Sequence, residues 1–195
     1  MIKGTFVNFD IWNACNLRCK FCYNDWRRNI RTYFEDFNDL KKRAKELRNK
    51  TDSINLIWWE PLMFPKIFEL LEYLEELGFS ISVVTNWLWF YKEDFFKKFF
   101  SYKSVVKITL SVHSISDENN FKISQRKNIE EKRLVIVDKL CSLQSSWKLK
   151  LSVTTVINKY NYDEIIDIFN YYKSKWINSF WFTWIILKRN HLKVI

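Results

Sequence analysis

Glycine and proline are both scarce in this chain of 195 residues, which contains two of each. Because proline is rare and 48% of the residues are hydrophobic, the chain is not of the disordered or low-complexity class, and its length suits one domain with its own core. The sequence also lacks a hydrophobic run of about 18 residues and a basic, then apolar leader after Met1. These absences predict a cytoplasmic protein without a membrane span.

Tryptophan is abundant where glycine is missing. Average usage of about 7% would give roughly 14 glycines, yet the chain has 2 Gly and 10 Trp. Several tryptophans stand at predicted turns, where glycine is favoured: Trp58, Trp59, Trp87 and Trp176. We hypothesise that these positions are UGA codons that the organism reads as glycine. The alternative is a chain that is truly rich in tryptophan.

The chain carries a formal net charge of +10, which would suit a partner such as RNA. Arg27, Arg28 and Arg31 add a basic stretch close to a cysteine-rich segment. Most lysines, however, are scattered over the predicted helices, as is typical of solvated helix faces. Binding of RNA is therefore an alternative that the sequence does not favour. It predicts an affinity for RNA that falls steeply as the salt concentration rises.

Short β-branched segments alternate with helical segments along the chain. Strands are predicted at residues 5–12, 53–57, 80–85, 105–111, 149–157 and 180–186. Helices are predicted at residues 36–48, 65–78, 93–100, 130–143 and 163–174, with a polar loop at 114–128. Such alternation favours a parallel sheet with right-handed crossovers. The expected fold is α/β, a partial (β/α)6 TIM-like barrel with parallel strands, in a single domain of residues 1–195 whose core is residues 5–186.

Cys15, Cys19 and Cys22 follow the first predicted strand with the spacing C-x3-C-x2-C. Three thiolates on one loop can hold three corners of an iron–sulfur cube, whose usual ligands are four cysteines, and leave one iron open for chemistry. Three of only four cysteines in one short segment suit a metal in a reducing compartment better than a disulfide framework. The alternative is a non-catalytic module in which His113 completes a structural zinc site of four ligands.

Polar residues follow five consecutive predicted strands at the point where each strand ends. The C-terminal ends of parallel barrel strands meet at one rim, so side chains there can form one pocket. The cysteines follow the first strand, and the other exits carry Glu60, Asn86, Ser111 with His113, and Asn158. Strand ends favour polar residues in any case. It is the five exits together that predict a site.

The cysteine segment resembles that of the radical S-adenosylmethionine (SAM) superfamily, including Asn16-Leu17 after the first cysteine and Phe21 before the third. Residues 58–62, Trp-Trp-Glu-Pro-Leu, are similar to the Gly-Gly-Glu-Pro-Leu motif of the same superfamily, with both glycines replaced. The resemblance covers nearly the whole chain. It implies a 4Fe–4S cluster on the three cysteines, with SAM chelated by the fourth iron.

The resemblance also implies where SAM binds. In the family, the backbone of the two glycines passes close to the methionine end of SAM, so the indoles of Trp58 and Trp59 would block SAM unless these positions are glycine. Glu60 belongs to the same motif and is expected to support SAM binding. Further SAM contacts are expected from polar and aromatic residues of the neighbouring loops: Phe21, Asn86, Ser111 and His113.

The activity implied by the resemblance is radical chemistry on a substrate. An electron donor such as flavodoxin or ferredoxin would reduce the cluster, and SAM would be cleaved to methionine and a 5′-deoxyadenosyl radical that takes hydrogen from the substrate. The substrate class stays open between peptides, nucleosides, RNA and partner proteins. Only nine residues follow the last predicted strand, too few for a closing helix. The chain could then be a minimal enzyme or a shortened copy of a longer one, and a partner subunit could cover its edge strand.

Overall fold

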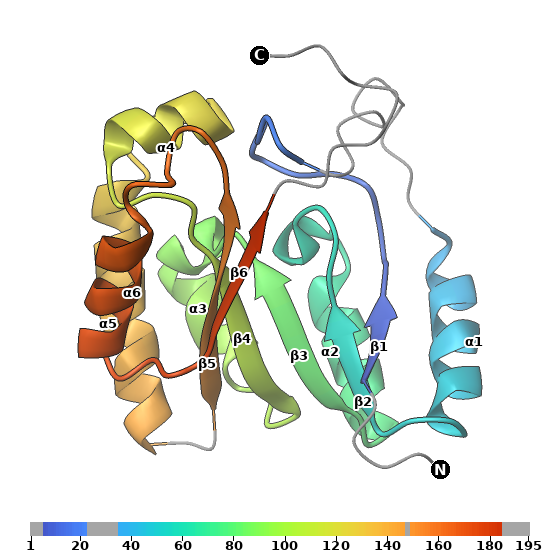
Figure 1. Cartoon of the computed structure of the whole chain (residues 1–195). Coiled ribbons are helices and arrows are strands. Elements are labelled where there is room, and N and C mark those ends of the chain that lie inside the picture. Colours follow the sequence, from blue (N-terminus) through green and yellow to red (C-terminus); the bar gives the residue numbers. More distant parts are fainter. Residues whose placement is uncertain (1–5, 23–34, 147–148, 185–195) are drawn as a thin grey trace.

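The computed structural model describes residues 6–22, 35–146 and 149–184. Its centre is one sheet of six parallel strands in the order of the sequence. The strands are β1 (Phe6–Phe9), β2 (Ser53–Leu56), β3 (Ser80–Thr85), β4 (Val105–Ser111), β5 (Lys150–Ile157) and β6 (Phe180–Trp184). Because each strand pairs with the next along the chain, the connections all progress in one direction, and the sheet curls into a half-barrel (Figure 1).

Helices connect the strands and cover the outer face of the curled sheet (Figure 1). They are α1 (Phe37–Arg48), α2 (Ile67–Glu76), α3 (Glu93–Phe99), α5 (Glu130–Ser146) and α6 (Ile165–Ser174). The apolar residues that recur at helical spacing are buried, as with Leu40 and Ala44 on α1 and Leu70 and Leu74 on α2. The predicted partial (β/α)6 barrel of parallel strands is confirmed.

The polar loop predicted at 114–128 is wrong, because these residues contain helix α4 (Asp117–Ser124). The side-chain oxygen of Ser116 caps α4 by accepting the N–H of Asn119 at 3.3 Å. Two acidic residues in the first turn favour the helix dipole. Because α4 is short and mostly polar, it has no apolar stripe of the kind that reveals a helix in a sequence.

Two short 3-10 helices and several element ends also differ from the predictions. The helices η2 (Pro61–Met63) and η3 (Leu88–Tyr91) follow the ends of β2 and β3. The helix predicted to open at Pro65 begins at Ile67 instead, after a turn that follows η2. Of the predicted strand bounds, residues 5 and 185–186 lie outside the described residues.

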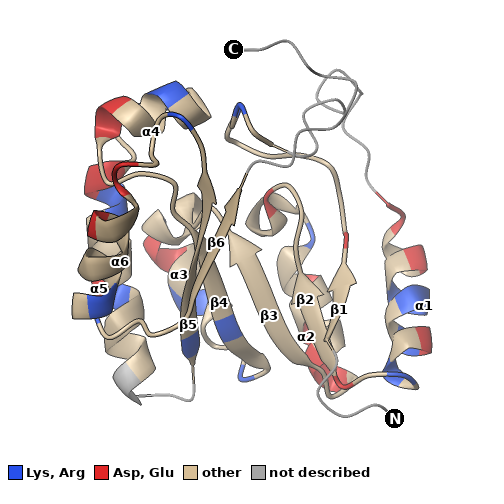
Figure 2. Ribbon diagram, viewed as in Figure 1, with Lys and Arg blue, Asp and Glu red and all other residues tan. Residues whose placement is uncertain are grey.

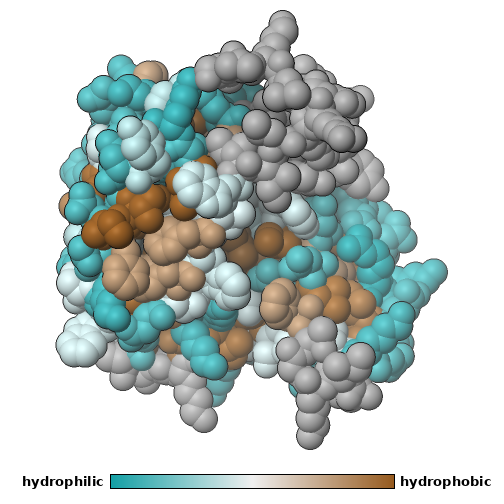
Figure 3. Space-filling model, viewed as in Figure 1, coloured by the Kyte–Doolittle hydropathy of each residue, from teal (hydrophilic) through white to brown (hydrophobic). Residues whose placement is uncertain are grey.

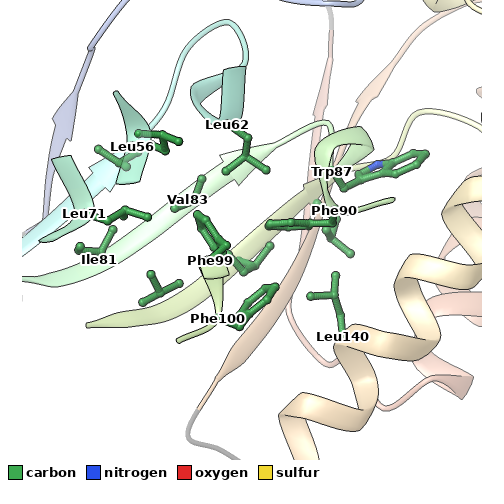
Figure 4. Packing of buried hydrophobic residues seen from close by; sticks show 14 of the residues in the cluster. Leu56, Leu62, Leu71, Ile81, Val83, Trp87, Phe90, Phe99, Phe100 and Leu140 are labelled. Carbon is green, nitrogen blue, oxygen red and sulfur yellow. The ribbon is translucent and has the colours of Figure 1, made fainter. Parts of the chain in front are cut away.

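The core between the sheet and the helices is rich in phenylalanine. Phe90 of η3 is fully buried, and its ring centroid lies 5.1 Å from those of both Phe99 and Phe100 (Figure 4). Figure 4 also shows Leu140, on the neighbouring helix α5, facing this group of rings. Aromatic packing of this kind fixes the position of η3, which directly follows the end of β3.

At the edge of the described sheet, β6 pairs with β5 alone, and its side chains are mostly exposed. Figure 3 shows hydrophobic side chains on the surface over this part of the molecule. Trp181 and Trp184 are 61% and 70% exposed. Within the described residues, no helix has the length and apolar character needed to cross a membrane.

We predict that Phe90→Ala lowers the free energy of unfolding by about 3–5 kcal/mol, because it leaves a cavity among packed rings. Urea unfolding followed by circular dichroism measures this. The control is Ile166→Ala on α6, whose side chain is 68% exposed and whose loss should cost about 0.5 kcal/mol or less. Equal effects of the two substitutions would contradict the assignment of Phe90 to the core.

Candidate functional site

The cysteine loop extends from the end of β1 and lies at the C-terminal edge of the sheet (Figure 1). Backbone hydrogen bonds attach it to the end of α4: the N–H of Arg18 donates to the carbonyl of Ser124 at 3.0 Å, and the N–H of Lys20 donates to that of Ile123 at 2.9 Å. Cys15, Cys19 and Cys22 form no disulfide and are partly buried. Helix α4, which the sequence analysis missed, therefore positions the three cysteines.

Glu60 anchors the start of the same loop through its backbone. Its N–H donates to the carbonyl of Ala14 at 3.0 Å, and its carbonyl accepts the indole N–H of Trp12 at 2.9 Å. Both bonds join the exit of β2 to the exit of β1. The predicted proximity of the cysteine segment and Glu60 is thus present in the fold.

The side chain of Glu60 is fully buried and accepts three hydrogen bonds. The N–H of Leu62 and the hydroxyl of Thr85 donate to Oε1 at 3.1 and 2.7 Å, and the N–H of Asn86 donates to Oε2 at 2.7 Å. Burial raises the pKa of Glu60 to about 7, against the opposite effect of these donors. The carboxyl group therefore fixes the exit of β3 to that of β2.

Asn86 continues this network to the cysteines. Its side-chain N–H2 donates to Oδ1 of Asn16 at 2.7 Å and lies 3.6 Å from the sulfur of Cys15. Its own Oδ1 accepts the N–H of Leu88 at 3.3 Å, which fixes the amide orientation. Asn86, predicted as a site residue from its place after β3, thus lies next to the first cysteine.

Cys15 is the cysteine whose environment the structure defines most fully. Burial raises its pKa to about 12, and the negative charge of Glu60 adds to the rise. The N–H of Leu17 donates to the sulfur at 3.4 Å, as does the amide of Asn86 at 3.6 Å. Two N–H donors at one sulfur suit a metal-bound thiolate, and a bound metal supplies the positive charge that deprotonates the thiol.

His113 links β4 to β5 and to the cysteine loop. Its Nδ1 accepts the N–H of Val156 at 3.2 Å, and its ring meets Phe21 edge-on with centroids 4.6 Å apart. Burial lowers the pKa of His113 to about 4, so the ring is neutral and carries its proton on Nε2. Phe21 and His113 together form an aromatic wall beside the cysteines.

The three cysteines match the thiolate ligands of an iron–sulfur cube, and His113 is the fourth candidate ligand of a structural zinc. A zinc site needs its four ligands around one ion, and all four candidates, Cys15, Cys19, Cys22 and His113, lie in the described part of the chain. In that part no three His, Cys, Asp or Glu side chains are arranged to hold a single metal ion. In a cube each thiolate binds a different iron, so this convergence is not required.

Ser111 and Asn158 also follow or end strands, but in the described part of the chain the hydrogen bonds at these residues do not involve the cysteine loop or Glu60. The backbone carbonyl of Ser111, at the end of β4, accepts the indole N–H of Trp87 at 3.1 Å. Asn158 holds a turn, because its Oδ1 accepts the N–H of Tyr160 at 2.9 Å and its Nδ2 donates to the carbonyl of Val156 at 3.0 Å. Asn158 therefore has a local structural role, whereas SAM contacts of Ser111 stay a prediction.

The tryptophans that replace the motif glycines share a backbone feature. Trp58 and Trp59, directly before Glu60, have φ angles of 76° and 50°, and Trp87 after Asn86 has 58°. These values lie in the left-handed region that favours glycine. The indole N–H of Trp59 is buried without a hydrogen-bond partner among the described residues.

Basic residues surround the exposed side of the cysteine loop. Arg18 and Lys20 are exposed at its tip, where Figure 2 shows basic positions. Arg126 donates to the carbonyl of Asn16 at 3.4 Å from the segment after α4. The arginines at 27, 28 and 31, singled out in the sequence, lie outside the described residues.

The sequence reasoning missed the residues that support the site from other elements. Thr85, which donates to Glu60, is the last residue of the predicted strand 80–85, and its position next to Asn86 was the available signal. The carbonyls of Ile123 and Ser124 gave no signal at all, because any residue has a backbone carbonyl.

We predict that Glu60→Gln lowers the free energy of unfolding of the metal-free protein by about 1–3 kcal/mol. The change keeps the shape of the side chain but replaces one accepting oxygen with an NH2 group that faces a donor. Urea unfolding measures the effect. Glu69→Gln on the exposed face of α2 is the matched control, expected within about 0.5 kcal/mol of the original chain. Equal stability of the two variants would show that the carboxyl group does not join β2 to β3.

Comparison with known proteins agrees with this geometry. The profile of the radical SAM superfamily matches residues 10–172. An S-adenosylmethionine-dependent nucleotide dehydratase of Flammeovirga pacifica is 28% identical, over 84% of this chain and 57% of that protein. A GTP 3′,8-cyclase of Aquifex aeolicus is 27% identical, over 86% of this chain and 52% of that protein. The chain thus spans about half the length of these relatives, and both are named as enzymes.

Solved structures share the fold. Streptococcus suis SuiB bound to S-adenosylmethionine superposes with a TM-score of 0.77 at 17% identity, over 100% of this chain and 43% of that one. The protein anSMEcpe with bound AdoMet superposes with a TM-score of 0.69 at 18% identity, over 93% of this chain and 52% of that one. Members of the superfamily bind a 4Fe–4S cluster and SAM. From its matched profile and its half-barrel, the chain belongs to the radical SAM superfamily.

Proposed function

We propose that this chain is the catalytic core of a radical SAM enzyme that acts on a nucleotide. Cys15, Cys19 and Cys22 would hold the 4Fe–4S cluster, and SAM would lie against the exits of β2, β3 and β4. The observation that supports this most directly is the hydrogen-bonded chain from Cys15 through Asn86 to Glu60. It joins the thiols to the acid of the Glu-Pro-Leu segment.

When bound, the cluster supplies the electron for cleavage of SAM, after which hydrogen is taken from the substrate. The protein binds, orients and excludes water. Asn86 and the N–H of Leu17 would stabilise the thiolate of Cys15, because both donate to its sulfur. Phe21 and His113 pack edge-on, and one of the two rings would provide an aromatic face for the adenine of SAM. An electron donor such as flavodoxin or ferredoxin and a cytoplasmic location would suit three cysteines that form no disulfide.

A nucleotide substrate is supported by the relatives and by charge. The relatives are named for nucleotide dehydration and for cyclisation of GTP. Arg18 and Lys20 at the tip of the cysteine loop, with Arg126 beside it, place positive charge at the mouth of the site. Arginine and lysine are the side chains that bind phosphate groups. Their position fits a substrate whose phosphates stay at the rim while the sugar and base enter.

We predict that Cys19→Ala abolishes cluster binding, because a cube on this loop needs all three thiolates. After anaerobic reconstitution, the original chain should contain about four irons and the variant close to none, as measured by iron and sulfide analysis. The control is Cys141→Ala on α5, whose thiol donates to the carbonyl of Lys175 outside the site. Full iron content in Cys19→Ala would contradict the ligand assignment.

We predict that Arg18→Ala combined with Lys20→Ala weakens binding of a nucleoside triphosphate by about tenfold or more. The measurement is equilibrium dialysis of the reconstituted protein, with Lys42→Ala and Lys45→Ala on the exposed face of α1 as the charge-matched control. Binding of an RNA oligonucleotide that exceeds that of the triphosphate would favour the RNA alternative instead. Equal nucleotide affinity of both double variants would remove the cysteine-loop cations from the substrate site.

A further inference from the structure

Most of the non-glycine residues with a positive φ in the described part of the chain are tryptophans. Six non-glycine residues in the described part of the chain have a positive φ, and four of them are Trp58, Trp59, Trp87 and Trp176, at 76°, 50°, 58° and 64°. A side chain with a Cβ meets a carbonyl oxygen in this region, which is why glycine prevails there. The described tryptophans outside turns, such as Trp12 and Trp89, have no positive φ. The conformation therefore belongs to the positions and not to tryptophan.

The ends of α2 and α6 provide an internal comparison, because they have the same hydrogen bonds. After α2, the N–H groups of Gly78 and Phe79 donate to Glu75 and Leu74 at 2.8 and 3.0 Å. After α6, the N–H groups of Trp176 and Ile177 donate to Lys173 and Tyr172 at 3.0 and 3.1 Å. This is the helix end in which glycine is usual at the left-handed position. Trp176 stands where Gly78 stands, and its side chain is 79% exposed.

Trp59, directly before Glu60, differs from a well-placed tryptophan of the same region. The indole of Trp12 is buried, donates to the carbonyl of Glu60 at 2.9 Å and packs against Phe64. The indole N–H of Trp59 is buried without a partner among the described residues, although buried indoles usually have one. The indole of Trp87 points away from the ring of Phe90 (Figure 4), but it is buried and donates to the carbonyl of Ser111 at 3.1 Å, so only the backbone of this residue supports glycine. Its backbone, with φ at 58°, again has the glycine conformation.

We propose that the functional protein carries glycine at positions 58, 59, 87 and 176, because its organism reads UGA as glycine. UGA and the tryptophan codon UGG differ in one base, so a gene read with UGA as tryptophan would show this composition of 2 Gly and 10 Trp. Glycine at 58 and 59 removes two indoles from the exit of β2, directly before Glu60. This second part rests on the proposed function: the space so opened admits the methionine end of SAM.

The codons of the gene test the proposal directly. UGA is expected at 58, 59, 87 and 176, whereas UGG is expected at Trp12 and Trp89, whose φ angles are not positive. UGG at all four turn positions would overturn the proposal.

Stability tests the proposal without SAM. Trp176→Gly should raise the melting temperature by about 2–4 °C, because it relieves the left-handed backbone and loses little packing. Trp181→Gly, an exposed tryptophan in β6, is the control and should lower the melting temperature, since glycine weakens a strand. A fall with Trp176→Gly as large as that of the control would overturn the inference for this position.

SAM binding separates the inference from the proposed function. Trp58→Gly combined with Trp59→Gly should bind SAM at least about tenfold more tightly than the chain with tryptophan, in equilibrium dialysis of the reconstituted protein. Trp89→Gly is the control, with no gain expected. If UGA codons and the Trp176 result support glycine but the double variant gains no SAM affinity, the proposed function fails and the glycine assignment stands.

Discussion

The structure of the site depends on one buried carboxyl group. Glu60 is removed from water and accepts hydrogen bonds from Leu62, Thr85 and Asn86, which offset the cost of its burial. A carboxyl group of this kind is stable only where several donors meet it, so the exits of β2 and β3 must lie in a fixed relation. The backbone of the same residue holds Ala14 and the indole of Trp12. Glu60 therefore fixes the start of the cysteine loop, while α4 fixes the segment around Arg18 and Lys20.

Much of this site follows from the order of elements in the sequence. Alternating strands and helices give a parallel sheet whose strand ends meet on one rim, and the cysteines, Glu60 and Asn86 were predicted there. What the sequence could not supply is the direction of each side chain. A glutamate after a strand can face a ligand or face the protein, and the surrounding donors decide between the two. In this fold the carboxyl of Glu60 faces Thr85 and the backbone, while Asn86 faces Cys15.

Helix α4 illustrates a different limit of sequence reasoning. Its contribution to the site is made by the carbonyls of Ile123 and Ser124, which accept the N–H groups of Lys20 and Arg18 from a loop about a hundred positions earlier in the chain. Backbone groups carry no residue-specific signal, and a short polar helix carries little periodicity. Such long-range backbone pairing becomes visible only when the half-barrel brings β1 and β4 to the same rim.

The four tryptophans with a left-handed backbone conformation bear on the stability of the fold and on the proposed SAM site. A residue with a Cβ loses roughly 1–2 kcal/mol in this conformation, so four of them would cost on the order of 4–8 kcal/mol. Whole domains are stable by only about 5–15 kcal/mol. The backbone cost of tryptophan at the four turns is thus of the same order as the stability of a domain, and glycine removes that cost. The same replacement at 58 and 59 would remove two indoles from the turn directly before Glu60, where the proposed function puts SAM, so glycine at these positions would serve both the fold and the proposed site.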